Sequence, residues 1–586
     1  MKKGLRALSI GVLLTTLSGC SFVQRFLPGN DSQISIVPEN DDDKSFTARS
    51  VPFTNLTSEY QIDNDALTLY FLDGGSVPYV SAMGFIRGLD GFFDCGENLR
   101  YQFYPQSNFL GVYRYYNGNQ QSYVQFQWDN NRVWVSDMSF FTSITKSTAD
   151  TNFGSYIKSV DYYSSGKESV AFRLGSYYFD ICYFEKKCLV PLTIMNLLFC
   201  SPNQYNIFYN GDSLYGYYGE ISKYDSDYSK IFTSSLNGQD CPDDVRKASV
   251  NSLLFTLDYF YGLKNHKDIE GFKDYIGEDN LKKLWSNDPS VNREAYTDIL
   301  YTKLDDLHTR INSASSYMNQ TIDTSLTWDQ YGEFRKDFYT IDDQLTTQRK
   351  SVFPNGVQPV RYFGDTAIIT FDSFVTAASS DIYDSRGNLK DTAWQYDTYY
   401  FMRHCMADIK RHSGINDVLI DLSQNGGGYI SAMERCLGFL TDNVLTRSLL
   451  DYLDGEYSTY YYKIDTDGDG YYDDDAYDQY RWTILSSLNT FSAANEFTSD
   501  AKHQGIAKII GQRSGGGMCP VMPTVLADGT AITISSSSTI RYVRKENGKN
   551  VYYSVEGGVK PNLEIPYSDF YSDSKLVSYI DQVWDA

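Results

Sequence analysis

The spacing of hydrophobic residues changes along the chain and divides it into regions of different predicted structure. Between about Tyr60 and Tyr228, Tyr and Phe recur in short alternating runs such as SYVQFQW and YNIFYNG, which Gly, Asn and Asp interrupt. This alternation is typical of strands with one buried face. We therefore predict a β-rich domain over residues 60–235.

From Asp243 onward the hydrophobic period lengthens to that of a helix. Four residues fall at the i, i+3, i+4 and i+7 positions of one buried stripe: Val250, Leu253, Leu254 and Leu257. A second helix is predicted over REAYTDILYTKLDDLHTRI, residues 293–311, with His308 one position beyond its apolar face. These patterns predict a helical subdomain over residues 240–350.

Beyond about Val357, predicted strands and helices alternate. The strands are TAIITFDSF, DVLIDLS, WTILSS and AKIIGQR, and the helices are DTYYFMRHCMADIKRHS, YISAMERCLGFLTD and AANEFTSDAKHQ. Such alternation predicts a layered α/β domain with parallel strands, whose functional groups gather at the strand ends. The predicted fold is therefore multidomain α+β, with this mixed α/β domain over residues 351–586.

The first twenty residues, MKKGLRALSIGVLLTTLSGC, resemble a lipoprotein signal. Lys2, Lys3 and Arg6 precede an apolar run too short for a stable membrane span, and small residues precede Cys20. We expect removal of residues 1–19 and lipidation of Cys20; an ordinary secretory leader is the alternative. The polar, acidic residues 20–59 are predicted to be a flexible tether. The protein is expected to be exported and lipid-anchored to the cell membrane or outer membrane, facing outside the cytoplasm.

Charge and cysteine content exclude several classes of partner and site. Loss of three leader cations from a net charge of −23 leaves about −26, so neither nucleic acid nor an anionic lipid surface is an expected partner. Eight cysteines follow Cys20, five in the N-terminal half and three in the C-terminal half, without a CxxC pair. This pattern lacks zinc spacing and favours buried thiols, with room for one or two disulfides.

Ser492, in LNTFSAANEF, stands between a predicted strand and a predicted helix. A serine nucleophile needs a nearby base and hydrogen-bond donors for the oxyanion that forms on attack. The N–H of Ala493, at the start of the helix, is one such unpaired donor. From these residues alone, a plain helix cap is the favoured interpretation of Ser492.

Five sequence segments in order resemble the core of the C-terminal processing, or tail-specific, peptidases and their tricorn-core relatives. They are LDDLHT (304–309), DVLIDLSQNGGG (417–428), ILSSLNTFSAANEF (484–497), GIAKIIGQRSGGG (505–517) and YYSVEGGVKPNLEI (552–565). The resemblance covers roughly Asp243 to Pro566, with no evident PDZ domain between Ile311 and Val357. It implies a mixed α/β spiral catalytic domain and a serine endopeptidase that cleaves polypeptides or peptides through an acyl-enzyme, with Ser492 as the nucleophile.

The resemblance also implies the base. Many tail-specific peptidases use a lysine, but the aligned residue is Gly517, and no Lys or Arg lies between Gly515 and Thr524. The tricorn-type branch uses a histidine, and among the five histidines of the chain only His308 lies in a family motif. We therefore predict His308 as the general base.

Glu556 resembles the glutamate that orients this histidine. Leu307 stands where the tricorn pattern has a serine, so Asp306 and Thr309 remain alternative orienters. The alternative interpretation of Glu556 is a solvated carboxylate on a hairpin.

The glycine-rich turn NGGG, residues 425–428, follows a predicted strand, and we predict Gly427 with Ala493 as the oxyanion hole. A phosphate-binding loop is a poor alternative because no Lys-Ser/Thr pair follows. The family usually has Arg at the position of Ser423 and Asp at the position of Asn562. We therefore expect the loops at these positions to be held by other contacts than in the family.

DTDGDGYYDDD, residues 465–475, resembles the front of a calcium loop. Asp465, Asp467 and Asp469 alternate before Gly470, with Asp473 nearby, but the twelfth position is Ala476 rather than Glu. A structural calcium is predicted, with an acidic surface loop as the alternative. No cofactor is expected for catalysis.

A second function class remains open at this point. The same fold would serve a catalytically inactive binding protein for peptide, lipid or glycan ligands at the cell surface. The joint presence of Ser492, His308 and Glu556 favours the enzyme.

Overall fold

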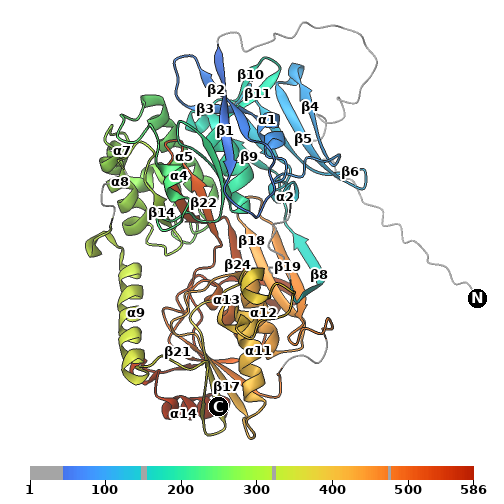
Figure 1. Ribbon diagram of the computed structural model, residues 1–586, viewed down its shortest axis with the longest axis vertical. Coiled ribbons are helices and arrows are strands. Elements are labelled where there is room, and N and C mark those ends of the chain that lie inside the picture. The colour runs from blue at the N-terminus through green and yellow to red at the C-terminus, as the bar shows by residue number, and fades with distance from the viewer. Residues whose placement is uncertain (1–43, 147–154, 320–324, 473–476, 586) are drawn as a thin grey trace, which may run out of the picture. The chain divides into compact units, whose positions relative to one another are not determined.

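The computed structural model describes residues 44–146, 155–319, 325–472 and 477–585 (Figure 1). In this part the protein is a multidomain α+β chain, with sheets in its N-terminal part, helices in the middle and a mixed α/β part at the C-terminal end. The predicted signal and Cys20 lie outside the described residues. No helix among the described residues has the length and apolar composition needed to cross a bilayer.

Two antiparallel-rich sheets form the predicted β-rich region. The first has the order β10 (Cys182–Phe184), β11 (Lys187–Pro191), β3 (Pro78–Ser81), β2 (Ala66–Leu72), β1 (Phe46–Asn55), β13 (Leu214–Tyr218) and β12 (Tyr205–Tyr209). The second has the order β4 (Leu99–Tyr104), β5 (Phe109–Tyr116), β6 (Asn119–Gln127), β7 (Arg132–Val135) and β9 (Val170–Arg173). Aromatic and aliphatic side chains of both sheets share one core.

The boundary of the tether, predicted at residue 59, is wrong. Strand β1 spans Phe46–Asn55 and pairs with β2 over seven residues and with β13 over three. Only Val51 and Phe53 of this strand are buried. A strand that buries just two side chains and follows an acidic run carries too weak an alternation to be recognised, and its place is fixed by backbone pairing.

One strand of the predicted N-terminal domain belongs to a C-terminal sheet. β8 (Ile157–Ser165) pairs antiparallel with β19 (Tyr457–Ile464), at the end of the order β25 (Lys549–Ser554), β24 (Ser538–Glu546), β18 (Leu445–Asp451), β19 and β8. Seven of its nine residues are exposed. The boundary drawn at residue 235 therefore does not separate the two parts, because the partner of an edge strand is set by tertiary structure.

The middle of the chain is helical, as predicted. It contains α5 (Asp243–Phe260), α6 (Phe272–Ile276), α7 (Glu278–Leu284), α8 (Pro289–Thr297) and α9 (Glu333–Val352). α5 buries the predicted stripe against the core of the β-rich region.

The single helix predicted over residues 293–311 is wrong in its second half. α8 ends at Thr297, a π-helical turn covers Asp298–Lys303, and the chain then leaves the helix. Asp305 has φ = 43°, which a right-handed helix cannot continue. Its carboxylate instead accepts the N–H groups of Phe334 (2.7 Å) and Arg335 (3.0 Å) at the start of α9. His308 therefore lies in a loop, not on a helix.

The C-terminal part is built on a six-stranded sheet. Its order is β15 (Val360–Phe363), β16 (Thr366–Thr370), β17 (Asp417–Asp421), β20 (Arg481–Ser486), β21 (Lys508–Gly511) and β26 (Leu563–Glu564). β16, β17, β20, β21 and β26 are parallel, and β15 is antiparallel to β16. The four predicted strands are thus confirmed in one sheet.

Alternate side chains of these strands enter two different cores. Ile420 and Ile484 face α11 (Thr398–Ile409), α12 (Ile430–Leu437) and α13 (Ala493–His503), which Figure 1 shows grouped beside the sheet. Leu419 and Leu485 face α14 (Asp573–Asp585) and two residues of α9, Ile341 and Leu345. Burial on both faces explains the almost continuous hydrophobic strands.

A three-stranded sheet joins the histidine loop to the C-terminal part. β14 (Arg310–Ser313), which begins two residues after His308, pairs antiparallel with β23 (Ala531–Ser535), which pairs with β22 (Val521–Val525). This pairing brings residues about 220 positions apart in sequence into register.

The eight cysteines after Cys20 are all free thiols, and seven of them are buried. Burial raises the pKa of the Cys436 and Cys519 thiols well above its usual range, which keeps them protonated. The structure therefore contains buried thiols and none of the disulfides for which the sequence left room.

Candidate active site

Ser492 occupies a sharp turn between β20 and α13. Its backbone has φ = 56° and ψ = −124°, a conformation that non-glycine residues rarely adopt. The Ser492 N–H donates to the carbonyl of Gly516 (2.9 Å), and Phe491 pairs with Gly516 in a parallel bridge. This turn presents a partly exposed hydroxyl at the start of a helix, as the nucleophile turns of hydrolases do.

His308 reaches this hydroxyl from the histidine loop. Its Nε2 lies 3.0 Å from Ser492 Oγ, although 184 residues separate the two. The ring packs against Phe491, with ring centroids 4.8 Å apart, and is 7% exposed. The His308 N–H donates to Asp306 Oδ1 (3.1 Å), which fixes the backbone of the loop. The predicted pair is therefore within hydrogen-bond distance.

Burial holds His308 in its neutral form. It lowers the pKa of the imidazole, with Asp306 opposing and Arg310 adding to the effect. To accept the serine proton at Nε2, the neutral ring must carry its own proton at Nδ1. Nδ1 is buried and has no hydrogen-bond partner among the described residues.

None of the three predicted orienters bonds to this nitrogen. Oε2 of Glu556 accepts the N–H groups of Gly517 (3.1 Å) and Met518 (2.8 Å). Asp306 Oδ2 accepts the hydroxyls of Thr309 (2.6 Å) and Ser535 (2.6 Å). Direct contact between Glu556 and the histidine, expected from the resemblance, is thus not seen.

The pKa of the Glu556 carboxyl is nevertheless shifted by its surroundings. Burial, with a smaller contribution from the charge of Asp306, raises its pKa to about 7. The same carboxyl holds the backbone of Gly517 and Met518, next to the Gly516 carbonyl that accepts the Ser492 N–H. Glu556 is therefore linked to the nucleophile turn through the backbone.

The backbone N–H groups that are free to act as oxyanion donors differ in part from the prediction. Ala493 is the first residue of α13, so its N–H has no intrahelical acceptor. The N–H of Gly427, however, donates to Asn425 Oδ1 (3.0 Å) and is not available to a substrate. Because a backbone N–H can make only one good hydrogen bond, Gly427 as a donor is a correction to the sequence prediction.

Gly428 offers the unpaired N–H in the same turn. Gly428 forms a parallel bridge with Phe374. In this bridge the Phe374 N–H donates to the Gly427 carbonyl (2.8 Å), and the Phe374 carbonyl accepts the Tyr429 N–H (2.8 Å). Gly428 lies between these two bonded residues, so in a parallel bridge its own N–H points away from Phe374. Within the described residues, the Gly428 N–H has no acceptor.

The position of Gly427 leaves no room for a side chain beside Ser492. Its φ is +105°, and a Cβ at this position would lie 2.7 Å from Ser492 Cβ and 2.9 Å from the Ala493 nitrogen. Gly517, where a lysine would align, has φ = +85°, and a Cβ there would lie 2.6 Å from the Phe491 ring. A lysine at residue 517 has no room in this arrangement.

Comparison with known families identifies the domain around this site. Residues 365–565 match the model of peptidase family S41. This part of the chain belongs to that family. The matched S41 segment contains Ser492 and Glu556, whereas His308 comes from a segment outside it. No curated protein sequence matches the chain.

Three solved structures are similar to parts of the chain at low sequence identity. A lipoprotein from Streptococcus agalactiae is 14% identical with a TM-score of 0.34, over 58% of this chain and 98% of that one. Mature CPAF is 14% identical with a TM-score of 0.34, over 58% and 96%. The tricorn protease is 11% identical with a TM-score of 0.28, over 93% and 59%.

Two residues that support the S41 site were not singled out from the sequence. Asn425 accepts the Phe491 N–H at its carbonyl (3.1 Å) while its side chain holds Gly427, so it joins the glycine turn to the nucleophile turn. Phe491 packs on the His308 ring. Asn425 stands in the quoted NGGG turn, which is the only signal that could have indicated its role.

The two departures from the family pattern have local replacements. Ser423 Oγ lies 3.1 Å from the hydroxyl of Tyr571, and its carbonyl accepts the Ser487 hydroxyl (2.5 Å). Asn562 bonds to Ile509 through both its N–H and its side-chain oxygen. The glycine turn and β21 are therefore held without the Arg and Asp of the family.

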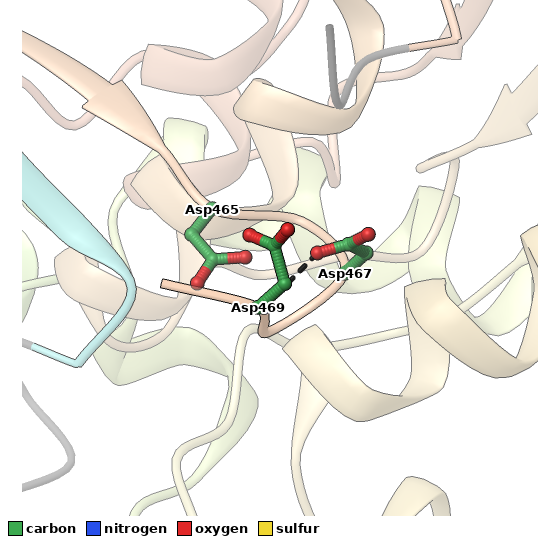
Figure 2. A group of neighbouring side chains, drawn as sticks. All are labelled: Asp465, Asp467 and Asp469. Atoms are coloured by element: carbon green, nitrogen blue, oxygen red, sulfur yellow. Dashed lines mark hydrogen bonds between the residues drawn. The ribbon is translucent and has the colours of Figure 1, made fainter. Parts of the chain in front are cut away.

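The acidic loop after β19 gathers three carboxylates, shown in Figure 2. Asp465, Asp467 and Asp469 each have a carboxylate oxygen within 4.8 Å of the others. Asp465 is buried and accepts the N–H groups of Gly468 (2.5 Å) and Gly470 (2.9 Å). The fourth predicted ligand, Asp473, lies outside the described residues.

Proposed function

We propose that this protein is an exported serine endopeptidase that cleaves polypeptides or peptides through an acyl-enzyme on Ser492, with His308 as the base. The observation that carries the proposal is the 3.0 Å distance between Ser492 Oγ and His308 Nε2, at a strained turn within an S41 domain. The test is hydrolysis of a fluorogenic peptide library. The native protein should turn over members of the library and Ser492→Ala should not; equal rates would contradict the proposal.

The proposed chemistry assigns one group to each step. His308 takes the Ser492 proton as the oxygen attacks the peptide carbonyl, and the N–H groups of Ala493 and Gly428 stabilise the oxyanion. The imidazolium then protonates the leaving amine, and a water deprotonated by the same ring releases the acyl group. Glu556, with its pKa raised to about 7, supports the imidazolium electrostatically and fixes the backbone beside the nucleophile.

The pH dependence of activity should identify the base. Burial lowers the pKa of His308, so the neutral ring persists below the ordinary histidine value of about 6.5. kcat/KM should therefore fall only as the pH drops below about 6.5. Glu556→Gln should lower kcat, because it removes the charge that supports the imidazolium. The acidic limb should remain, because it belongs to His308 and because the glutamine oxygen can still hold the Gly517 N–H.

A different outcome would assign the acidic limb of the pH profile to the Glu556 carboxyl. If kcat/KM of the native protein falls with a midpoint near 7, the value to which burial raises the pKa of Glu556, and the limb is absent in Glu556→Gln, then Glu556 is the titrating group. Steady-state kinetics from pH 4.5 to pH 9 would decide between the two.

The acidic loop is proposed to bind a structural calcium. Asp465, Asp467 and Asp469 supply the oxygen ligands that calcium prefers, on a loop tightened by Gly468 and Gly470. Millimolar calcium should raise the melting temperature by about 2–4 °C, and Asp467→Ala should remove the response. Asp391→Ala, at another exposed aspartate, is the control. Equal melting of the native protein in calcium and in chelator would refute the site.

Lipidation at Cys20 is proposed from the LSGC sequence. The native protein should partition with membranes, and Cys20→Ala should release it into the soluble fraction, because the acyl chains supply the membrane affinity. Mass spectrometry of the mature N-terminus is the direct measurement. Membrane retention of Cys20→Ala without an acyl mass on the native protein would contradict the assignment.

A further inference from the structure

A cavity of about 1240 Å³ is lined by residues of both the β-rich region and the helical middle of the chain. The lining comes from residues 72–79 around the turn between β2 and β3, from residues 176–179, and from α5, α6 and α7. Its volume exceeds the roughly 300–1,000 Å³ of most small-molecule sites, which favours an extended guest. None of the described lining residues belongs to the S41 segment or to the histidine loop, so the cavity is separate from the candidate active site.

Two aromatic residues of the lining are exposed to solvent. Tyr178 is 84% exposed and Trp285 is 41% exposed. Tyr178 follows the short helical turn Leu174–Tyr177 with φ = 59°, a left-handed conformation that is uncommon for a bulky residue and in which glycine is usual. An exposed ring gains little from packing to offset this backbone strain. The conformation therefore indicates a role for the Tyr178 ring outside the core.

An almost fully buried amide also lines the cavity. Asn251, on α5, is 8% exposed, and its side chain forms no hydrogen bond with any described residue. A carboxamide has two N–H donors and one acceptor, and buried amides are nearly always bonded. A guest with hydroxyl groups would satisfy this amide, whereas a purely apolar guest would bury it without a partner at a cost in free energy.

The charges around the cavity are balanced. Of the four aspartates in the lining, two form ion pairs with cations next to the cavity, and two are matched in number by lysines of the lining itself. The ion pairs are Asp243–Arg246 and Asp258–Lys264, and the matched residues are Asp73 and Asp244 with Lys247 and Lys273. Because the whole chain has a net charge of −23, this local balance is distinctive, and it favours an uncharged guest.

We propose that this cavity binds a neutral oligosaccharide, whose sugar rings pack on Tyr178 and Trp285 and whose hydroxyls bond to the Asn251 amide. A sugar ring has an apolar C–H face and hydroxyls around its edge, so it matches both the aromatic rings and the unpaired amide. The site would attach the protein to a glycan. This inference goes beyond the proposed peptidase function and does not depend on it.

Isothermal titration calorimetry of the native protein with neutral hexasaccharides tests the proposal. The probes are maltohexaose, cellohexaose, laminarihexaose and the hexamer of N-acetylglucosamine, and the anionic comparison is hexagalacturonate. At least one neutral hexamer should bind at one site per chain, and hexagalacturonate should bind roughly 10-fold more weakly, because the chain is acidic and no excess of cations lines the cavity. Absence of binding by all four neutral hexamers, or equally tight binding of hexagalacturonate, would overturn the proposal.

Asn251→Leu separates a sugar from an apolar guest. The substitution keeps the size of the side chain but removes its donors and acceptor, so the affinity for the hexamer should fall by roughly 10-fold or more. The melting temperature should not fall, because a buried amide without a partner is replaced by an apolar group. Unchanged or tighter binding in Asn251→Leu would show that the guest contacts the cavity through apolar surface alone and would overturn the assignment.

Tyr178→Gly separates binding from folding. Glycine relieves the strain at φ = 59°, so the melting temperature should hold or rise while the affinity falls by roughly 10-fold. Trp285→Ala should weaken binding to a similar extent. Tyr224→Ala is the control, because Tyr224 is as exposed (86%) and lies outside this cavity, and it should bind the hexamer like the native protein. Native affinity in both Tyr178→Gly and Trp285→Ala would overturn the site.

Peptide hydrolysis distinguishes this inference from the proposed function. All of these variants should hydrolyse the fluorogenic peptide library at the native rate, because none of the substituted residues lies in the candidate active site. Loss of sugar binding with intact hydrolysis would therefore support the separate site. Sugar binding by a native protein that hydrolysed no peptide would also support it and would remove only the peptidase proposal.

Discussion

Ser492→Ala and His308→Ala should each lower kcat for peptide hydrolysis by roughly 10⁴- to 10⁶-fold, and the double variant should be no slower than either single one. The reason is that the 3.0 Å pair acts as one unit: without the base the hydroxyl stays protonated, and without the hydroxyl the base has no nucleophile to activate. A serine-directed phosphonate should label Ser492 in the native protein, and labelling should be nearly lost in His308→Ala.

His404→Ala is the matched control, because His404 also stacks on an aromatic ring, that of Trp394, with centroids 4.5 Å apart. It should retain native turnover. If His308→Ala retained turnover while Ser492→Ala lost it, another group would be the base. Full activity of both variants would remove the peptidase mechanism itself.

Gly427→Ala should lower kcat by about 100-fold, an effect typical of displacing reacting groups by about 1 Å. The added Cβ would meet Ser492 Cβ at 2.7 Å and the Ala493 nitrogen at 2.9 Å, and φ = +105° is unfavourable for alanine. The variant should thus move both the nucleophile and one oxyanion donor while KM changes little.

Gly426→Ala provides the control for this prediction. It is the preceding glycine of the same turn, and a Cβ there has no heavy atom within 4 Å. Gly426→Ala should keep near-native kcat and melting temperature. Equal effects of the two substitutions would show that the turn tolerates no side chain at either position, and would contradict the specific role of Gly427.

The C-terminal fold could be predicted because its signals are local. Strands such as DVLIDLS and helices such as α11 have long hydrophobic runs with turns at their ends, and all four predicted strands lie in one sheet. Predictions failed where local signals were weak. β1 buries only two side chains, and the helix predicted over residues 293–311 ends early because Asp305 turns away to cap α9.

The sequence indicated which residues lie in the site, but it did not indicate the hydrogen bonds that they form. Ser492 and His308 were indicated by motifs, and the structure places them together. The same motifs indicated Gly427 as a donor, but its N–H bonds to Asn425, and Glu556 bonds to the backbone rather than to His308. Hydrogen-bond partners depend on distances of a few tenths of an ångström, which residue order does not contain.

The sequence by itself determined the alternation of strands and helices, the excess of negative charge, the absence of a lysine near Gly517, and the residues available for serine chemistry. Tertiary structure alone decided that a loop 184 residues before Ser492 brings His308 Nε2 to 3.0 Å from the serine hydroxyl, and that β8 pairs with β19. The division has one physical cause. Hydrophobic periodicity and charge are properties of neighbouring residues, whereas the meeting of distant segments depends on how sheets pair and cores pack.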